Sequence, residues 1–198
     1  MIVIFTKQRE IYGKKKDFEF LYEYLYWSYA NLAMAHSAVT KGAEKYIQIN
    51  YIIRARLFKG LKQKTMNIGS IIDDERLKMK LPQICSYCGS KENLSVDHLI
   101  PKFKGGLETG DNFVWACRKC NSSKNKIDFM EWHNKKGVFP SLLLLRRYLK
   151  VVIEYCTINE LMDFSLNEAK TAILPFSLEH VPQVYPKPSE LKIWVTEI

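Results

Sequence analysis

The chain has 198 residues, of which 26% are charged and 47% hydrophobic, and this composition excludes collagen-like, low-complexity and acidic disordered proteins. Lysine and arginine number 30 against 21 acidic residues, which gives a net charge of +9. This excess favours a polyanionic partner, either nucleic acid or an acidic membrane surface, and says nothing about the fold. The net charge is +7 over residues 1–81, +3 over 82–137 and −1 over 138–198, so the positive field belongs to the first two thirds.

Residues 1–81 are predicted to form a helical, basic N-terminal region. Asp17 is expected to cap a helix that runs to about Thr40 and is ended by Gly42. The tyrosines and the tryptophan between Tyr22 and Tyr29 put apolar surface around most of this helix, which indicates burial on several sides or contact with a partner. A second helix is expected over residues 43–64, with isoleucine and leucine on one side and basic residues elsewhere.

Targeting and membrane signals are missing from the sequence. The apolar stretch Met1–Thr6 is too short for a signal peptide. The longest apolar window, Phe18–Val39, is interrupted by polar residues and lacks the roughly 18 clean apolar residues of a membrane span. We therefore expect a soluble cytoplasmic protein.

Residues 82–137 change in character, being rich in cysteine, glycine, asparagine and short β-prone runs such as Leu94–Val96 and Phe113–Trp115. A short helix over about residues 125–136 is expected to close this segment. In residues 138–198, Pro140 is a good first residue for a strongly apolar helix. Beyond Leu174 the prolines predict an extended arm that wraps the surface.

Four of the five cysteines form two Cys-x-x-Cys pairs, and 28 residues separate the pairs. Two such knuckles can place four thiolates around one ion, and Zn²⁺ favours closed tetrahedral sites of this kind. The alternatives are a redox dithiol or chance spacing. We interpret the pairs as a structural zinc site that stabilises a segment with little core of its own. Its ligands would be Cys85, Cys88, Cys117 and Cys120. Cys156 stands alone in an apolar stretch and is expected to be a buried thiol.

Polar residues inside this cysteine clamp have the chemistry of phosphodiester hydrolysis. Asp97 and His98 are expected on the strand that leaves the first knuckle, and Asn121 directly follows the last cysteine. Carboxylate and amide oxygens suit a hard cation such as Mg²⁺ or Mn²⁺. The imidazole of His98 can act as a base near neutral pH. Taken singly, His98 could be a structural strand residue and Asn121 a helix cap.

The string Cys-x-x-Cys-Gly, Asp-His-Leu-Ile-Pro, Gly-Gly, Asn and Cys-x-x-Cys-Asn-x-x-Lys resembles the HNH endonucleases, the ββα-metal nucleases, in their zinc-ribbon form. The resemblance covers about residues 82–137. It implies an α+β fold in which a mainly helical chain surrounds a small ββα-metal nuclease core with a zinc ribbon. Asn121 stands where the commonest pattern has histidine, so the set is His-Asn-Asn, a variant that leaves the metal preference open.

The resemblance implies a role for each site residue. His98 would be the general base that activates water, and Asp97 and Asn121 would hold the catalytic Mg²⁺ or Mn²⁺. Asn112 would brace the loop and orient His98, although next to Asp111 it also fits a purely structural turn. Lys124 would contact or neutralise the scissile phosphate.

The expected function is that of a metal-dependent endonuclease acting on DNA. Many members of the family serve in prokaryotic restriction or anti-phage defence, so the chain is also expected to act beside an ATPase or sensor subunit, or as a homodimer, with no membrane partner. A non-catalytic zinc-ribbon module that binds nucleic acid or protein explains the cysteines and the charge equally well. It leaves the joint occurrence of the other site residues at nuclease spacing unexplained.

Overall fold

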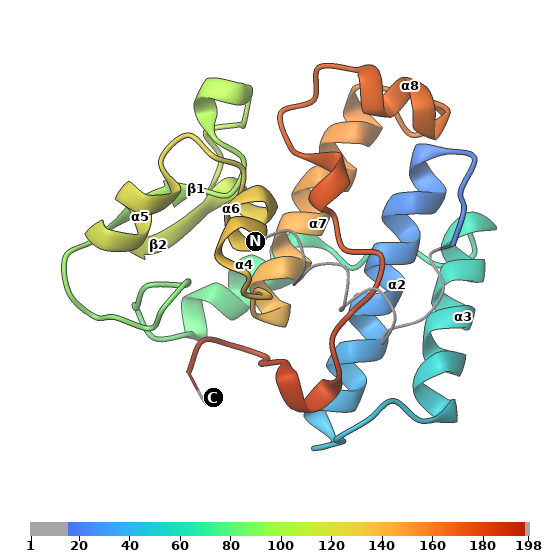
Figure 1. Cartoon of the computed structure of the whole chain (residues 1–198), viewed down its shortest axis with the longest axis horizontal. Coiled ribbons are helices and arrows are strands. Elements are labelled where there is room, and N and C mark those ends of the chain that lie inside the picture. The colour runs from blue at the N-terminus through green and yellow to red at the C-terminus, as the bar shows by residue number, and fades with distance from the viewer. Residues whose placement is uncertain (1–15, 197–198) are drawn as a thin grey trace.

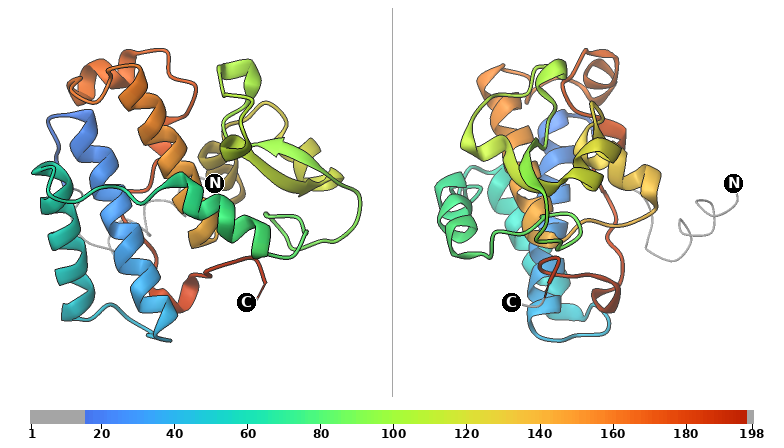
Figure 2. Two further views of the ribbon diagram at one scale, coloured as in Figure 1. Left: turned by 180° about the vertical axis from the view of Figure 1, so that it is seen from behind. Right: turned by 90° about the vertical axis from the view of Figure 1, so that its left-hand side faces the viewer.

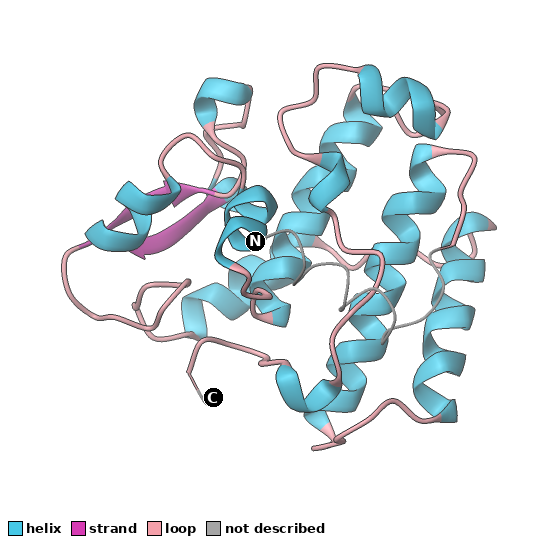
Figure 3. Cartoon of the chain, viewed as in Figure 1, coloured by secondary structure: helices cyan, strands magenta, loops and turns pink. Residues whose placement is uncertain are grey.

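The computed structural model describes residues 16–196, and the stretch Met1–Thr6 lies outside them. Helices dominate, and a single small antiparallel sheet appears among the described residues (Figures 1 and 3). The expected mixture of α and β structure is confirmed at this level. None of the helices in residues 16–196 combines the length and apolarity needed to cross a membrane.

The N-terminal helices are α2 (Leu21–Thr40) and α3 (Gln48–Lys62), which pack side by side. Asp17 does not cap α2, because the first turn donates its backbone amides to a distant loop, from Leu21 to the Phe164 carbonyl and from Tyr22 to the Met162 carbonyl. The helix ends as expected, since Gly42 has a positive φ of 65°. Helix α3 is shorter than predicted at both ends.

Helix α4 (Ile71–Lys80) was not expected from the sequence. The Ser70 hydroxyl accepts a hydrogen bond from the Ile72 amide and so caps this helix. Asp73 and Asp74 lie in its first turn and Lys78 and Lys80 in its last, so its charges complement the helix dipole. The Ser-x-x-Asp-Asp pattern was the signal that could have found it.

The sheet pairs β1 (Leu94–His98) with β2 (Phe113–Cys117), each slightly longer than predicted. The register places Leu94 opposite Cys117 and His98 opposite Phe113. Two short helices follow, α5 (Arg118–Lys124) and α6 (Phe129–Lys136). The first contains Asn121, where a helix start was expected, and the second lies within the helix expected over about residues 125–136.

Helix α6 starts later than residue 125 because the chain turns between α5 and α6. Asn125 has a positive φ of 49°, and the Asp128 carboxylate restarts the helix by accepting the amides of Met130 and Glu131. The chain therefore bends away directly after Lys124.

The C-terminal part contains α7 (Leu142–Ile158), α8 (Leu166–Thr171) and the expected proline-rich arm. Ser141 rather than Pro140 is the residue that precedes α7. The arm runs along the helices and passes the N-terminus of α7, where the Lys192 and Ile193 carbonyls accept the amides of Leu142 and Leu143 (Figure 2). It is part of the packed interior, with buried side chains at Phe176, Leu178, Val181, Tyr185, Leu191 and Trp194.

The largest buried cluster draws on all three sequence regions, from Leu21 on α2 through Leu99, Phe129 and Tyr148 to Trp194 in the arm. The tyrosines of α2 are largely used in this packing: Tyr24 donates its hydroxyl to the Leu178 and Val181 carbonyls of the arm. A second, smaller cluster surrounds the cysteines and includes Trp132, Ala116 and three of the four thiols of the knuckles. The sheet and α5 therefore stand at one side of a helical body (Figure 1).

Candidate active site and metal centre

The four knuckle cysteines lie together at the end of the sheet. Cys85 and Cys88 lie in the turn before β1, Cys117 ends β2 and Cys120 lies in the first turn of α5. Their sulfur atoms are all within 4.8 Å of one another, and Cys88 Sγ is 3.7 Å from Cys117 Sγ. Zn–S bonds of about 2.3 Å in a tetrahedron require sulfur atoms roughly 3.8 Å apart. The cluster therefore confirms a site that can hold one metal ion, and its dimensions fit Zn²⁺. Cys156 is buried alone on α7, as expected.

Asp97 lies on the face of β1 that α5 covers, and only 5% of its surface is exposed. Its Oδ2 accepts a hydrogen bond of 2.6 Å from the Tyr87 hydroxyl. Its Oδ1 accepts the His98 backbone amide at 2.8 Å and faces Lys124 Nζ at 3.2 Å. The carboxylate is thus held by three donors and has a fixed orientation.

Lys124 is completely buried at the end of α5. Its ammonium also donates to the His98 carbonyl at 2.5 Å. Burial lowers the pKa of Lys124, and the neighbouring Asp97 carboxylate opposes that shift. The structure therefore places this lysine as the counter-ion of Asp97, and a contact with a phosphate in solvent requires the ammonium to leave that carboxylate.

His98 ends β1 with a half-buried ring, which packs edge-on against Phe113 at 4.7 Å between ring centroids. Strand alternation turns this ring away from the face that carries Asp97. Its Nε2 atom is buried and has no hydrogen-bond partner in the described part of the chain. This nitrogen has a free lone pair or proton, and it can exchange a proton with a bound molecule once a movement of the ring or of its neighbours gives access to it.

Asn112 is fully buried and braces the loop that follows His98. Its side chain accepts the Ile100 amide at 2.8 Å and donates to the carbonyls of Ile100 and Leu107 at 2.8 and 2.9 Å. Its own carbonyl accepts the Leu99 amide. These bonds reach His98 through the backbone and not through the ring. Gly106 makes the loop possible, because a Cβ at that position would lie 2.0 Å from the Ile100 carbonyl oxygen.

Asn121 lies on α5 one turn before Lys124, over the same face of β1. Its amide NH₂ donates to Ser95 Oγ at 3.0 Å and to the Val96 carbonyl at 3.4 Å. These contacts leave the amide oxygen for another partner. Asp97, Lys124 and Asn121 thus share one face of the sheet, and the donor types of Asp97 and Asn121 suit a hard divalent cation.

Tyr87, which lies between the cysteines of the first knuckle, was not predicted from the sequence as a site residue. Its ring packs against Phe129, Trp132 and His133, with the nearest centroid, that of Trp132, at 4.9 Å. Burial raises the pKa of Tyr87 well above its usual value, so that its hydroxyl remains a donor to Asp97. Its position inside a Cys-x-x-Cys pair was the only sequence signal.

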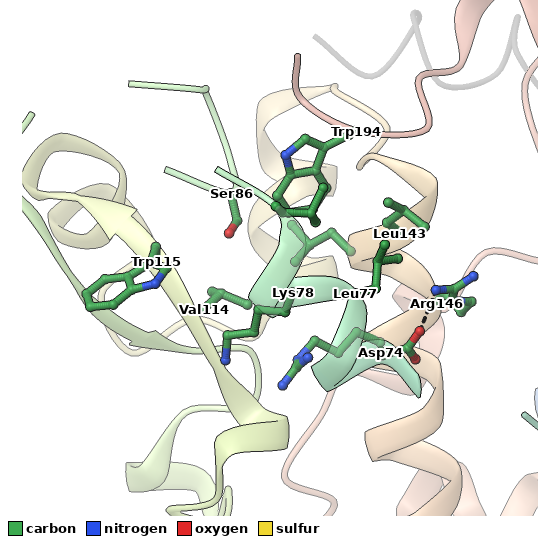
Figure 4. Close-up of a pocket in the computed structure, with 12 residues that line it drawn as sticks. Asp74, Leu77, Lys78, Ser86, Val114, Trp115, Leu143, Arg146 and Trp194 are labelled. Carbon is green, nitrogen blue, oxygen red and sulfur yellow. Dashed lines mark ion pairs between the residues drawn. The ribbon is translucent and has the colours of Figure 1, made fainter. Parts of the chain in front are cut away.

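The segment 110–113, which leads into β2, is held by hydrogen bonds from two helices of the helical body. Lys78 on α4 donates to the Phe113 carbonyl at 2.9 Å, and Arg147 on α7 donates to the Asp111 carbonyl at 2.7 Å. A cavity of about 40 Å³ lies where α4, β2 and α7 meet, and Figure 4 shows Asp74 at its side pairing with Arg146. The brace residue Asn112 is therefore anchored to the helices.

His133, which packs in the aromatic group around Tyr87, gives the stability of the protein a defined pH dependence. Burial lowers its pKa to about 4, and the Val138 carbonyl partly offsets this shift. Because an unfolded histidine titrates near pH 6.5, the unfolded chain takes up a proton that the folded chain does not, and stability falls as the pH drops from about 6.5 towards 4. Between pH 7.5 and pH 5 this costs about 2 kcal/mol.

We therefore expect urea denaturation to show that, between pH 7.5 and pH 5, the free energy of unfolding falls by about 2 kcal/mol more in the wild type than in His133→Gln. Asp128, whose pKa burial raises to about 6, changes stability in the opposite direction. Its effect is present in both proteins and cancels in the comparison. Equal decreases in the free energy of unfolding of the two proteins would show that His133 is not the source of this pH dependence.

Comparison with known proteins identifies the segment between the two knuckles. Residues 85–126 match the family described as HNH endonuclease. A stretch of 58 residues is 38% identical to the CRISPR-associated endonuclease Cas9 of Corynebacterium diphtheriae, covering 27% of this chain and 5% of that protein. The chain therefore spans about a twentieth of the length of this relative. No solved structure matches the chain.

Proposed function

We propose that this chain, whose residues 85–126 carry an HNH endonuclease domain, is a metal-dependent nuclease that hydrolyses DNA phosphodiester bonds. The observation that carries the proposal is that the segment matching the HNH family also contains an arrangement of side chains suited to the reaction. Within this matched segment, Asp97 and Asn121 share one face of the sheet, and the next residue along β1, His98, has an imidazole nitrogen without a partner among the described residues. These are a base and a pair of oxygen donors, the groups that hydrolysis of a phosphodiester needs.

In this proposal His98 Nε2 accepts the proton of the attacking water. Asp97 and Asn121 hold Mg²⁺ or Mn²⁺, which supplies positive charge beside the leaving oxygen when it is bound. Asn112 keeps the His98 backbone in place through the Leu99–Ile100 loop. Lys124 neutralises Asp97 at rest and, once released, is long enough to meet a phosphate. Zn²⁺ is proposed for the four-cysteine site.

The charge around the site favours a nucleic acid as substrate, and the resemblance to the HNH endonucleases alone favours DNA over RNA. Arg118 and Lys119 are exposed on α5, and Lys126 follows it directly. Cations beside the site contact phosphates and make binding strongly dependent on salt. The net charge of +7 over residues 1–81 adds affinity that does not depend on sequence.

A role in restriction or anti-phage defence, beside an ATPase or sensor subunit or as a homodimer, belongs to the same proposal. Its support is the similarity to an endonuclease whose name associates it with CRISPR, over 27% of the chain. Size-exclusion chromatography with light scattering measures the mass of the isolated chain and tests the homodimer directly.

One observation favours the alternative of a non-catalytic binding module. Lys124 is buried and already neutralises Asp97, so a divalent ion must displace or share the place of an ammonium. A module that never binds a second ion has no such competition to overcome. Metal titration separates the two functions: the nuclease binds Mg²⁺ or Mn²⁺ in addition to one ion in the cysteine cluster, and the binding module does not.

The direct test is cleavage of supercoiled, linear and single-stranded DNA with Mg²⁺ or Mn²⁺. We expect cleavage that chelation abolishes, and a loss of at least about 10-fold in metal affinity or rate for Asn121→Ala. Ser122→Ala, at the neighbouring exposed position of α5, is the matched control and should cut normally. Undiminished cleavage by Asn121→Ala would remove this residue from the site, and a wild type that cuts none of the substrates would overturn the proposed function.

A further inference from the structure

We infer that Tyr87 is a positioning residue that couples the four-cysteine metal site to Asp97, so that the metal in the cysteine cluster governs how tightly the second divalent ion binds. The inference rests on the proposed function in taking Asp97 as a ligand of that ion. It assigns to the knuckle a part in the site beyond holding the fold together.

The position of Tyr87 along the chain fixes one end of the coupling. The turn from Cys85 to Cys88 contains Tyr87, and its backbone is closed by the Gly89 amide, which donates to the Cys85 carbonyl at 2.8 Å. The Ser86 amide donates to the Trp115 carbonyl of β2 at 2.7 Å. Metal binding by the cysteines therefore fixes the backbone from which the Tyr87 side chain extends.

The Tyr87 side chain carries that constraint across to β1. Its ring lies against Phe129 and Trp132, so it cannot change rotamer without disturbing α6. At its far end the hydroxyl donates to Asp97 Oδ2 at 2.6 Å, the shortest of the bonds to this carboxylate. A half-buried side chain, held by its aromatic neighbours, thus connects the cysteine turn with the proposed ligand.

The acceptor positions of Asp97 show why this bond matters. A carboxylate offers about four lone pairs, two on each oxygen. The His98 amide and the Lys124 ammonium use both positions of Oδ1. Tyr87 takes one position of Oδ2 and so leaves one open. While Lys124 stays in place, the Tyr87 hydroxyl determines which direction remains for a metal ion.

Tyr87→Phe removes the hydroxyl and keeps the ring. Since residues that orient a metal ligand typically account for 10–100-fold in metal affinity, we expect Tyr87→Phe to bind Mn²⁺ about 10-fold more weakly than the wild type. The matched control is Tyr185→Phe, in which a buried tyrosine loses its hydrogen bond to the Ser28 carbonyl in the helical body. This control should bind Mn²⁺ like the wild type.

The experiment is a Mn²⁺ titration of the full chain followed by electron paramagnetic resonance, with the zinc content measured in each sample. It requires no cleavage. Weaker Mn²⁺ binding by Tyr87→Phe alone, at an unchanged zinc content, supports the inference. Equal Mn²⁺ affinities of the wild type and Tyr87→Phe overturn it and leave the proposed function standing. A loss of zinc from Tyr87→Phe that fully accounts for its weaker Mn²⁺ binding overturns the part assigned to Tyr87, because the hydrogen bond to Asp97 then contributes nothing of its own.

A second measurement uses the wild type and does not depend on how Tyr87→Phe folds. Coupling between two binding sites is reciprocal, so Mg²⁺ at Asp97 should strengthen zinc binding by the same factor, about 10-fold, that zinc strengthens Mg²⁺ binding. A zinc-selective chelator at equilibrium should therefore extract less zinc when Mg²⁺ is present. Extraction that Mg²⁺ does not change overturns the coupling. A wild type that binds neither Mg²⁺ nor Mn²⁺ outside the cysteine cluster overturns both this inference and the proposed function.

Discussion

Replacing His98 with alanine should reduce DNA cleavage by about 10²–10⁴-fold, the usual contribution of a general base. The expected loss is mainly one of chemistry, because the His98 ring makes no hydrogen bond through Nε2 within residues 16–196. Its ring packs edge-on against Phe113. Losing that aromatic pair costs about 1 kcal/mol of stability. The measurement is the single-turnover rate of plasmid cleavage at saturating metal, together with DNA affinity, which should stay within about twofold because the ring carries little of the positive charge.

The matched control is His180→Ala, which removes a half-buried histidine from the C-terminal arm. It should cleave at the wild-type rate. Rate loss in both variants would point to general damage, whereas an active His98→Ala would remove His98 from the role of base. Loss of DNA binding by His98→Ala would instead make this residue a substrate contact.

The parts of this molecule that could be predicted from the sequence are those set by local chemistry. Two Cys-x-x-Cys turns needed only their own spacing to be interpreted as one metal site, and four sulfurs within 4.8 Å confirm that they meet. The β-prone runs around Val96 and Trp115 gave the two strands within two residues. Gly42 ended its helix where a positive φ was expected.

Helix starts were predicted poorly because, in this chain, the free backbone amides of a first helical turn donate to carbonyls that are distant in the sequence. The first turn of α2 donates to carbonyls of Met162 and Phe164, and that of α7 donates to carbonyls of Lys192 and Ile193. A sequence-based search looks for a capping side chain next to the helix, and here distant backbone takes its place. The arm was likewise expected on the surface, since proline content does not reveal that its carbonyls and side chains complete the core.

The candidate site shows the same division. Asp97 and His98 could be identified as candidate site residues from their side-chain chemistry. Their adjacency on a strand does not reveal which residues contact the side chain on each face of the sheet. That Lys124 would be buried against Asp97 depends on α5 crossing β1, which no local pattern specifies. Tyr87 escaped notice because a tyrosine is an ordinary packing residue until its hydroxyl is seen on a carboxylate.

Removing the metal from the four-cysteine site should unfold the sheet and α5 while the helical body remains. Structural Zn²⁺ contributes about 10–16 kcal/mol of binding free energy in small domains, which is as much as the whole stability of a typical domain. The cluster around the cysteines contains few apolar side chains besides Trp132 and Ala116. By contrast, α2, α7 and the arm share the large cluster that contains Leu25, Leu149 and Tyr185.

We therefore expect a chelator, or Cys120→Ser, to abolish cleavage and to expose Trp115 and Trp132 to water, with most of the helical circular dichroism retained. Tryptophan fluorescence, far-ultraviolet circular dichroism and metal analysis measure the three effects on one sample. Cys156→Ala is the control, because this thiol is buried on α7 outside the cluster and its replacement should leave the metal content unchanged. If the metal-free chain keeps the tryptophan spectrum and melting temperature of the loaded protein, the cysteines do not hold the sheet together. The coupling through Tyr87 would then have no rigid knuckle from which to act.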